Sequence, residues 1–204
     1  MCIRDRYVHG QRGALKTVPQ PGVPTIILMA DATVEQFKQV KADKRVVVTR
    51  DPRSFIISCA DFHIDGPEIW WTREYTNKLI MAPSDEQRLL ITLDTVGGVI
   101  LRRIAEFIGI EDCHHVRLED LTHDRSCKTY FELVDYLDYP TAERKLFLQS
   151  LIRNSLWSMK RRKQRWPLHV TSGVPHNFLD RFTPAVQERY DELFGDLHKQ
   201  MGYE

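Results

Sequence analysis

The sequence predicts an α/β fold with a parallel sheet, on the strength of two apolar runs and the segment that joins them. Thr25 to Ala30 and Arg45 to Thr49 have the apolar, β-branched character of buried strands. Residues 31–41 between them have the length and polarity of a short helix. Two strands joined through a helix form a βαβ unit, in which the strands run parallel.

Composition indicates a globular chain with a sizeable core, since 42% of the 204 residues are hydrophobic and 28% are charged. A net charge of only +1 gives no support to a nucleic-acid-binding surface, so no nucleic-acid partner is predicted. No apolar run approaches the roughly 20 residues of a membrane span. The four cysteines show no CxxC spacing, and we expect reduced thiols.

The first six residues of the sequence do not resemble part of a natural protein. Met1 to Arg6, MCIRDR, matches the translation of a transposase-type sequencing adapter, and we expect residues 1–6 to be an artefact outside the fold. Residues 7–204 are then expected to form a single domain, as part of a longer protein that has lost an upstream segment. Localisation is left undetermined by this interpretation.

The most informative stretch follows the second apolar run. Arg50 stands where that strand would end, and Asp51 and Pro52 make a favourable helix start, because Asp caps free N–H groups and Pro suits the first helical position. Free N–H groups, the helix dipole and a forked guanidinium all favour an anion. Ser58 lies about two helical turns after Asp51 and returns to the same face. Arg50 and Ser58 are therefore predicted to hold one phosphate; the alternative is that Arg-Asp-Pro is only a surface turn.

An Arg-Asp-Pro at a strand end, with a serine eight residues after the arginine, resembles the 3′-phosphate-binding segment of sulfotransferases that use 3′-phosphoadenosine 5′-phosphosulfate (PAPS). Arg50 and Ser58 fall on the two phosphate ligands of that motif. The resemblance implies PAPS as cofactor and transfer of its sulfuryl group to an acceptor hydroxyl or amine. It also implies a P-loop-NTPase-like three-layer fold with a central parallel sheet, incomplete at the N-terminus. The family's 5′-phosphosulfate loop has no counterpart in these residues, so we expect the chain by itself to be inactive.

Two further segments extend the resemblance. Arg117 to Leu121 (RLEDL) is similar to the aromatic-Glu-Asp-Leu segment of these enzymes, with Leu118 in place of the usual tyrosine. Ser155 to Met159 (SLWSM) is similar to the Ser-Phe-x-x-Met stretch that packs near the adenine, which makes Ser155 a candidate cofactor contact. The Gly202-Tyr203 ending is also usual for the family.

A third segment, residues 170–183, resembles the Arg-Lys-Gly-x-x-Gly-Asp-Trp sequence that closes on the 3′-phosphate. Gly173 keeps the register, whereas Thr171 and Ser172 stand where the family has its two cations. Hydroxyls and backbone N–H groups at Thr171, Ser172 and Gly173 would bind a phosphate more weakly than cations do.

The remaining chain reads as helices with one short strand. Apolar spacing predicts a helix over residues 85–110, an amphipathic segment over 130–137 and helices over 146–159 and 184–201, with a strand over 115–118. The basic run 160–166 then follows at the end of one of these helices, where cations are favourable.

No catalytic residue is assigned. The family's base histidine would fall on Leu28, which cannot take a proton, so the base is either elsewhere, as at Asp31 or on a lost segment, or the alignment slips. The cysteines and histidines between Cys113 and Cys127 match no zinc-binding pattern, and no metal is predicted.

The acceptor and the oligomeric state are left open. Trp70, Trp71 and Tyr75 either line an acceptor pocket or pack beneath a loop. Two other classes of protein stay possible on the same residues: a P-loop nucleotide enzyme of the kinase type, and a non-catalytic binding module on the sulfotransferase fold.

Overall fold

The computed structural model describes residues 33–40, 42–65, 73–155, 158 and 178–204, and the chain divides into two compact units, Met1–Asp43 and Lys44–Glu204. In the first unit the described element is α1 (Val34–Gln39), a helix within the predicted span. A capping box begins it: the Thr33 side chain accepts from the Gln36 N–H and the Gln36 side chain accepts from the Thr33 N–H. The predicted strand at residues 25–30 lies outside the described residues.

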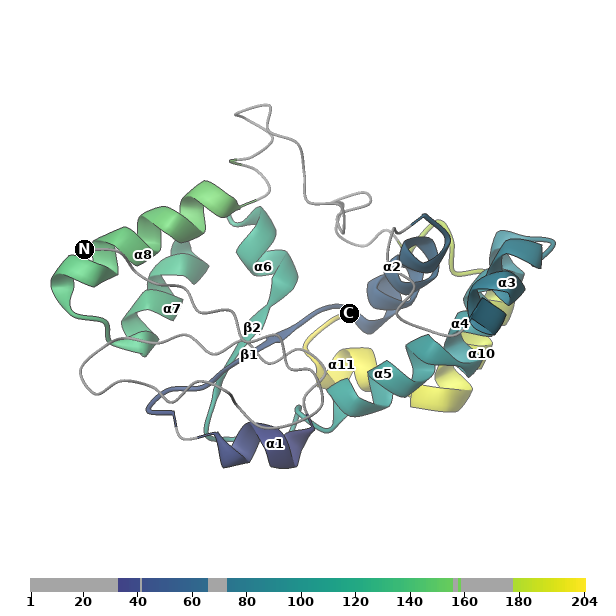
Figure 1. Ribbon diagram of the computed structural model, residues 1–204, viewed down its shortest axis with the longest axis horizontal. Helices are drawn as coiled ribbons and strands as arrows, with labels where there is room; N and C mark the ends of the chain where they lie inside the picture. Colours follow the sequence, from purple (N-terminus) through teal and green to yellow (C-terminus); the bar gives the residue numbers. More distant parts are fainter. Residues whose placement is uncertain (1–32, 41, 66–72, 156–157, 159–177) are drawn as a thin grey trace. The chain divides into compact units, whose positions relative to one another are not determined.

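The second unit contains a parallel pair of strands, β1 (Val46–Thr49) and β2 (His114–Arg117), which lie side by side in Figure 1. Val46 pairs with His114 and Thr49 with Arg117. The predictions of a parallel sheet and of a strand ending at Thr49 are confirmed, whereas the predicted pairing of this strand with residues 25–30 falls outside the described residues. Strand β2 begins and ends one residue earlier than predicted, because Leu118 is already the first residue of α6 (Leu118–His123).

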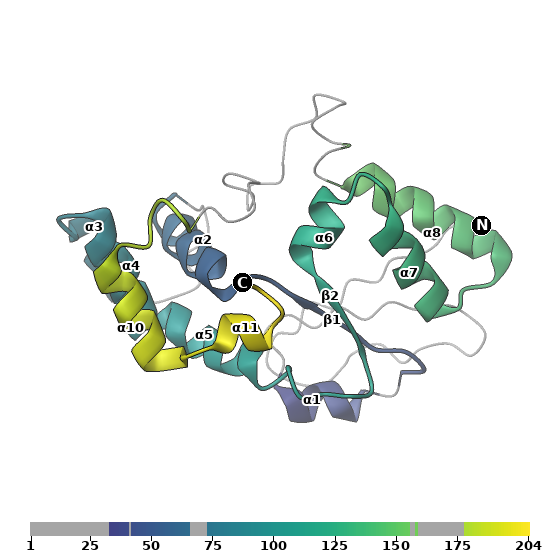
Figure 2. The same cartoon turned by 180° about the vertical axis from the view of Figure 1, so that it is seen from behind.

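Most of the core is made by helices packed on helices. Helix α2 (Pro52–Asp65) packs against α3 (Arg73–Met81), α4 (Asp85–Asp94), α5 (Val96–Ala105) and the short α11 (Leu197–Gln200). Helix α10 (Pro184–Phe194) packs on α4, and Figure 2 shows this group from behind. Fully buried side chains of the group include Ile56, Ile57, Leu89, Leu93, Leu101, Val186 and Tyr190. The described residues are thus mainly helical with a small parallel sheet, an α/β composition.

Helix α6 and the helix that follows it contact the second strand. Helix α7 (Lys128–Leu137) packs against β2, α6 and α8 (Thr141–Asn154), with Tyr130 and Val134 buried. The Tyr136 hydroxyl donates to the Arg45 carbonyl at 3.0 Å and lies 3.4 Å from the Arg45 nitrogen. This contact ties α7 to the residue before β1, at the amino end of the strand.

The prediction of one helix over 85–110 is wrong, because the chain breaks at Thr95 and forms α4 and α5. The two helices approach so closely after the break that position 98 has room only for glycine, since a Cβ on Gly98 would lie 2.1 Å from the Leu93 carbonyl oxygen.

The predicted helix over 184–201 also divides, because Gly195 has φ +52° and ends α10 before α11 begins. Helix α8 starts at Thr141 after Pro140, five residues before the predicted start at 146, and its C-cap is Ser155. Within the part of the chain that the structure describes, no helix is both long and apolar enough to cross a membrane.

Candidate functional site

The carboxyl ends of the two strands bring distant parts of the sequence together. Thr49 and Arg117 are paired in the sheet, so the residues that follow them leave from the same edge. After Thr49 the chain runs through Arg50 and Asp51 into α2, and after Arg117 it enters α6. This edge is where ligands bind in parallel α/β sheets.

The start of α2 has the predicted cap. The Asp51 Oδ1 accepts from the Arg53 backbone N–H at 2.9 Å, and Pro52 is the first helical residue. The carboxylate is also bound by the Arg53 side chain, from Nε at 3.1 Å and from Nη2 at 2.9 Å. Both side chains are buried. Asp51 therefore has its own cation, which is Arg53, and it does not form an ion pair with Arg50.

The Arg50 side chain is 29% exposed, and its nearest carboxylate is Glu119, with 4.0 Å between Nε and Oε1. Its two terminal nitrogens make no hydrogen bond to a residue that the structure describes. Burial lowers the pKa of Arg50, and the charges of Glu119 and Asp51 act in the opposite direction. An arginine keeps its charge at neutral pH, so this half-buried edge carries a cation whose fork is available to an anion.

Ser58 lies on α2 as predicted, half-buried, and the helix runs unbroken past it. A hydroxyl that sequence reasoning missed lies one turn before it. Ser54 is 1% exposed, and its Oγ has no hydrogen-bond partner among the described residues. The spacing of Asp51, Ser54 and Ser58, three and then four residues, puts all three on one helix face. No motif marks Ser54, and only its burial reveals it.

Glu119 is the residue that joins these elements. Its Oε1 accepts the Asp51 backbone N–H at 3.2 Å, and its Oε2 accepts the Tyr203 hydroxyl at 2.8 Å. The Glu119 side chain is 15% exposed. Tyr203 is buried, and burial together with the Glu119 contact raises the pKa of its phenol. The sequence had marked both residues as parts of family-like segments without giving either a role.

The end of the described chain is held at the same edge by two arginines. Arg117 Nη1 donates to the Gly202 carbonyl at 3.0 Å, and Arg53 Nη2 donates to the Glu204 carbonyl at 2.5 Å. Gly202 has φ +80°, a conformation that favours glycine. Residues 202–204 thus bridge Arg117, at the end of β2, and Arg53, in the first turn of α2.

The candidates Thr171, Ser172 and Gly173 lie outside the described residues, and the description of the chain resumes at Phe178. Phe178 is buried, and its ring centroid lies 4.0 Å from the Arg53 guanidinium carbon. Arg181 binds Asp61 of α2 at 2.8 and 2.9 Å and Asp85 of α4 at 2.8 and 2.6 Å. The polypeptide therefore returns to α2 five residues after Gly173.

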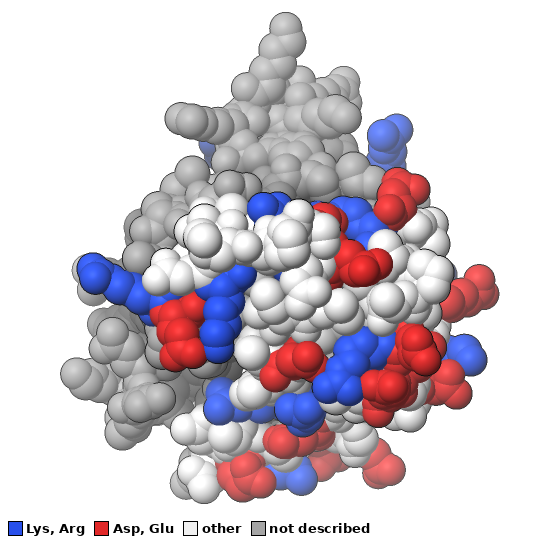
Figure 3. Space-filling view, turned by 90° about the vertical axis from the view of Figure 1, so that its right-hand side faces the viewer, with Lys and Arg blue, Asp and Glu red and all other residues white. Residues whose placement is uncertain are grey.

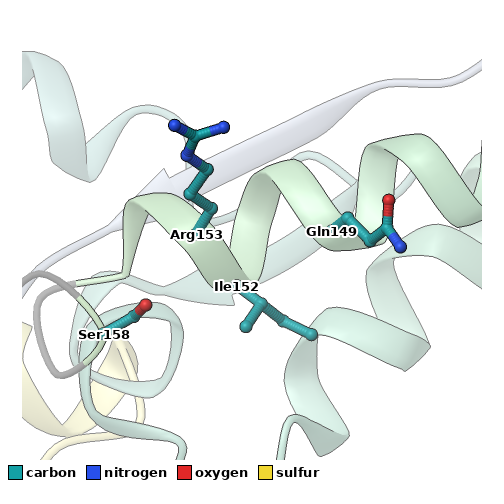
Figure 4. Close-up of a pocket in the computed structure, with 4 residues that line it drawn as sticks. All are labelled: Gln149, Ile152, Arg153 and Ser158. Carbon is teal, nitrogen blue, oxygen red and sulfur yellow. The ribbon is translucent and has the colours of Figure 1, made fainter. Parts of the chain in front are cut away.

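Ser155 ends α8. Its hydroxyl donates to the Ile152 carbonyl at 2.8 Å and accepts the Ser158 backbone N–H at 3.3 Å. An open pocket of about 480 Å³ is lined by Gln149, Ile152, Arg153 and Ser158, as Figure 4 shows. The Ser155 side chain is buried beside these residues and has a capping role whether or not a cofactor binds nearby.

Tyr75 and Cys59 are both buried in the helical core. Trp70 and Trp71 lie outside the described residues, whereas Tyr75 is buried with its hydroxyl 3.1 Å from the Thr92 hydroxyl oxygen. The packing interpretation therefore fits Tyr75. Burial raises the pKa of the Cys59 thiol to about 12, so this thiol is not a nucleophile at neutral pH.

A cysteine and a histidine do meet near the start of β2, with 3.3 Å between Cys113 Sγ and His115 Nε2. Among the described residues, however, no group of three or more His, Cys, Asp or Glu side chains has the arrangement of a metal site.

Charges of both signs are interspersed on the face shown in Figure 3. Several of the charged side chains in the described chain are paired; Arg189, for example, binds both Asp94 and Glu192 at 2.7 Å. Arg50 differs from them in having its fork unengaged by a described carboxylate.

Comparison of the chain with protein-family models, with curated proteins and with solved structures gives no match. The interpretation of the site therefore depends on its residues and their geometry.

Proposed function

We propose that the chain derives from a PAPS-dependent sulfotransferase, with a three-layer fold of the P-loop type, and that the edge beyond β1 and β2 is its 3′-phosphate site. The intact enzyme would transfer a sulfuryl group from PAPS to an acceptor hydroxyl or amine.

One observation carries this proposal: the Arg50 guanidinium is charged and half-buried, and its terminal nitrogens are unengaged by the described residues. It follows a parallel strand and precedes a helix that bears Ser58 two turns on. A fork of this kind suits a phosphate, which accepts two parallel N–H bonds. The neighbouring carboxylate of Asp51 does not compete, because Arg53 neutralises it.

On this proposal the residues divide into two roles. Arg50 and Ser58 bind the 3′-phosphate, and Thr171, Ser172 and Gly173 add hydroxyl and N–H contacts to it. Ser155 lies near the adenine. The bound cofactor supplies the sulfuryl group, and the residues named here contribute orientation, which accounts for much of the rate in group transfers of this type.

The test is a calorimetric titration with 3′-phosphoadenosine 5′-phosphate, with ATP as the comparison ligand. Arg50→Ala removes the fork, and Arg189→Ala is a matched control that removes a paired arginine from α10. Because charged hydrogen bonds contribute about 1.5–3 kcal/mol, we expect Arg50→Ala to weaken binding by about 10- to 150-fold. The control variant should bind as the unaltered chain does.

The alternatives give different results in the same experiment. A kinase-like nucleotide enzyme would bind ATP at least as tightly as the 3′-phosphorylated nucleotide. A folded chain that binds neither nucleotide would contradict the proposal for this polypeptide and would favour a non-catalytic module.

A further inference from the structure

We propose that Glu119 and Tyr203 are positioning residues for Arg50, and that the Tyr203 hydroxyl keeps Glu119 from closing on the arginine fork. The inference rests on the proposed function, and it adds a device that decides whether Arg50 is available to the 3′-phosphate.

The Arg50–Glu119 ion pair is unusually long. An arginine and a carboxylate that are this buried usually form two parallel hydrogen bonds of about 2.7–2.9 Å. Here the nearest atoms, Arg50 Nε and Glu119 Oε1, are 4.0 Å apart. The carboxylate is close enough to attract the guanidinium on its Nε side, and it leaves the two terminal nitrogens unoccupied.

The hydrogen bonds of Glu119 explain why the pair does not close. Each oxygen of Glu119 is already engaged, Oε1 by the Asp51 backbone N–H at 3.2 Å and Oε2 by the Tyr203 hydroxyl at 2.8 Å. Two hydrogen bonds at opposite ends fix the plane of a carboxylate. Turning it to bind Arg50 with both oxygens would break the Tyr203 bond, which costs free energy because the phenol is buried.

Tyr203 is held in place independently of its hydroxyl. The carbonyl of Gly202 accepts from Arg117, and that of Glu204 accepts from Arg53. The Tyr203 ring also lies under the Arg117 guanidinium, 5.7 Å from its central carbon. A phenylalanine at position 203 would keep all three contacts, so Tyr203→Phe removes only what the hydroxyl contacts, which is the Glu119 carboxylate and the Thr49 side chain.

The perturbation has a predictable direction. Without the phenol, the Glu119 carboxylate is free to rotate onto Arg50 and compete with the phosphate for the guanidinium. Tyr203→Phe should therefore weaken binding of 3′-phosphoadenosine 5′-phosphate by about three- to tenfold, the equivalent of one hydrogen bond. Binding of adenosine 5′-phosphate, which lacks the 3′-phosphate, should not change.

Tyr136→Phe is the matched control. It also removes a tyrosine hydroxyl close to β1, a half-buried one that binds the Arg45 backbone at the opposite end of the strand. Both variants should lower the thermal midpoint by a similar amount, and only Tyr203→Phe should alter nucleotide binding. This comparison separates positioning from general destabilisation.

Two double variants complete the test. Adding Glu119→Gln to Tyr203→Phe replaces the competing carboxylate with a neutral amide, and we expect it to restore binding. In an Arg50→Ala background, Tyr203→Phe should cause no further loss, because the group through which it acts is gone.

The outcomes distinguish this inference from the proposed function. If Arg50→Ala abolishes binding and Tyr203→Phe leaves it unchanged, the positioning role is refuted and the phosphate site stands. The same conclusion follows if Tyr203→Phe weakens binding equally with and without Arg50. If the unaltered chain shows no preference for the 3′-phosphorylated nucleotide, both proposals fail together.

Discussion

Replacing Arg53 with methionine should destabilise the second unit more than any surface change, because it leaves a buried carboxylate without a cation. The Arg53 and Asp51 side chains are 8% and 1% exposed. Arg53 gives Asp51 two side-chain hydrogen bonds, donates to the Glu204 carbonyl and stacks on the Phe178 ring. Methionine keeps the helix propensity and the apolar contact with that ring, and it loses the polar contacts.

The expected magnitude follows from the burial of the pair. Removing one partner of a buried ion pair costs about 3–5 kcal/mol, since the remaining charge is desolvated and uncompensated. A domain is stable by only about 5–15 kcal/mol, so this is a large fraction of the total. Urea unfolding followed by circular dichroism measures it as a shift in midpoint at constant slope.

A second variant tests the reason for the loss. Asp51→Asn in the Arg53→Met background removes the orphaned charge and keeps a side-chain oxygen that can accept the backbone N–H of residue 53. More than half of the lost stability should therefore return. Arg102→Met is the control, an exposed arginine 5.8 Å from the Phe194 ring centroid, and should change stability by less than about 0.5 kcal/mol. A loss below about 1 kcal/mol for Arg53→Met, or a double variant no more stable than the single one, would refute the reasoning.

Two further predictions concern packing and pH. Arg181→Ala should cost about 1 kcal/mol at neutral pH, because Asp85 is partly exposed and its ion pair is screened. The Arg181 hydrogen bond lowers the pKa of Asp85, so the stabilisation from this pair is present above the unfolded pKa of about 3.9 and is lost as the pH falls through the folded pKa. The stabilities of the variant and the parent, measured by unfolding, should therefore differ at pH 7 and converge at pH 3. A difference that does not depend on pH would contradict this. Gly98→Ala should cost more than about 2 kcal/mol by thermal unfolding, since its Cβ would lie 2.1 Å from the Leu93 carbonyl oxygen, whereas an unchanged midpoint would show that the α4–α5 junction opens easily.

Local sequence signals predicted the elements around the site well. A β-branched run followed by Arg-Asp-Pro fixes where β1 ends and α2 begins, because strand preference, capping and the fixed φ of proline all act on neighbouring residues. The same local signals failed to predict the end of a helix where that end depends on tertiary contacts. Apolar periodicity predicted one helix that continues through Thr95, whereas the structure has two helices that meet at Thr95, with a glycine pair in the first turn of the second.

The sequence by itself determined that a cation, Arg50, would stand between a strand and a helix, with Ser58 two turns away. Only the tertiary structure decided which charges around Arg50 are already neutralised. Asp51 is adjacent in sequence, yet it binds Arg53, while Glu119 and Tyr203, 69 and 153 residues further along the chain, share the edge with Arg50. The physical reason is that hydrogen bonds and ion pairs depend on distance in space, and the parallel pairing of β1 with β2 is what brings these residues to one edge.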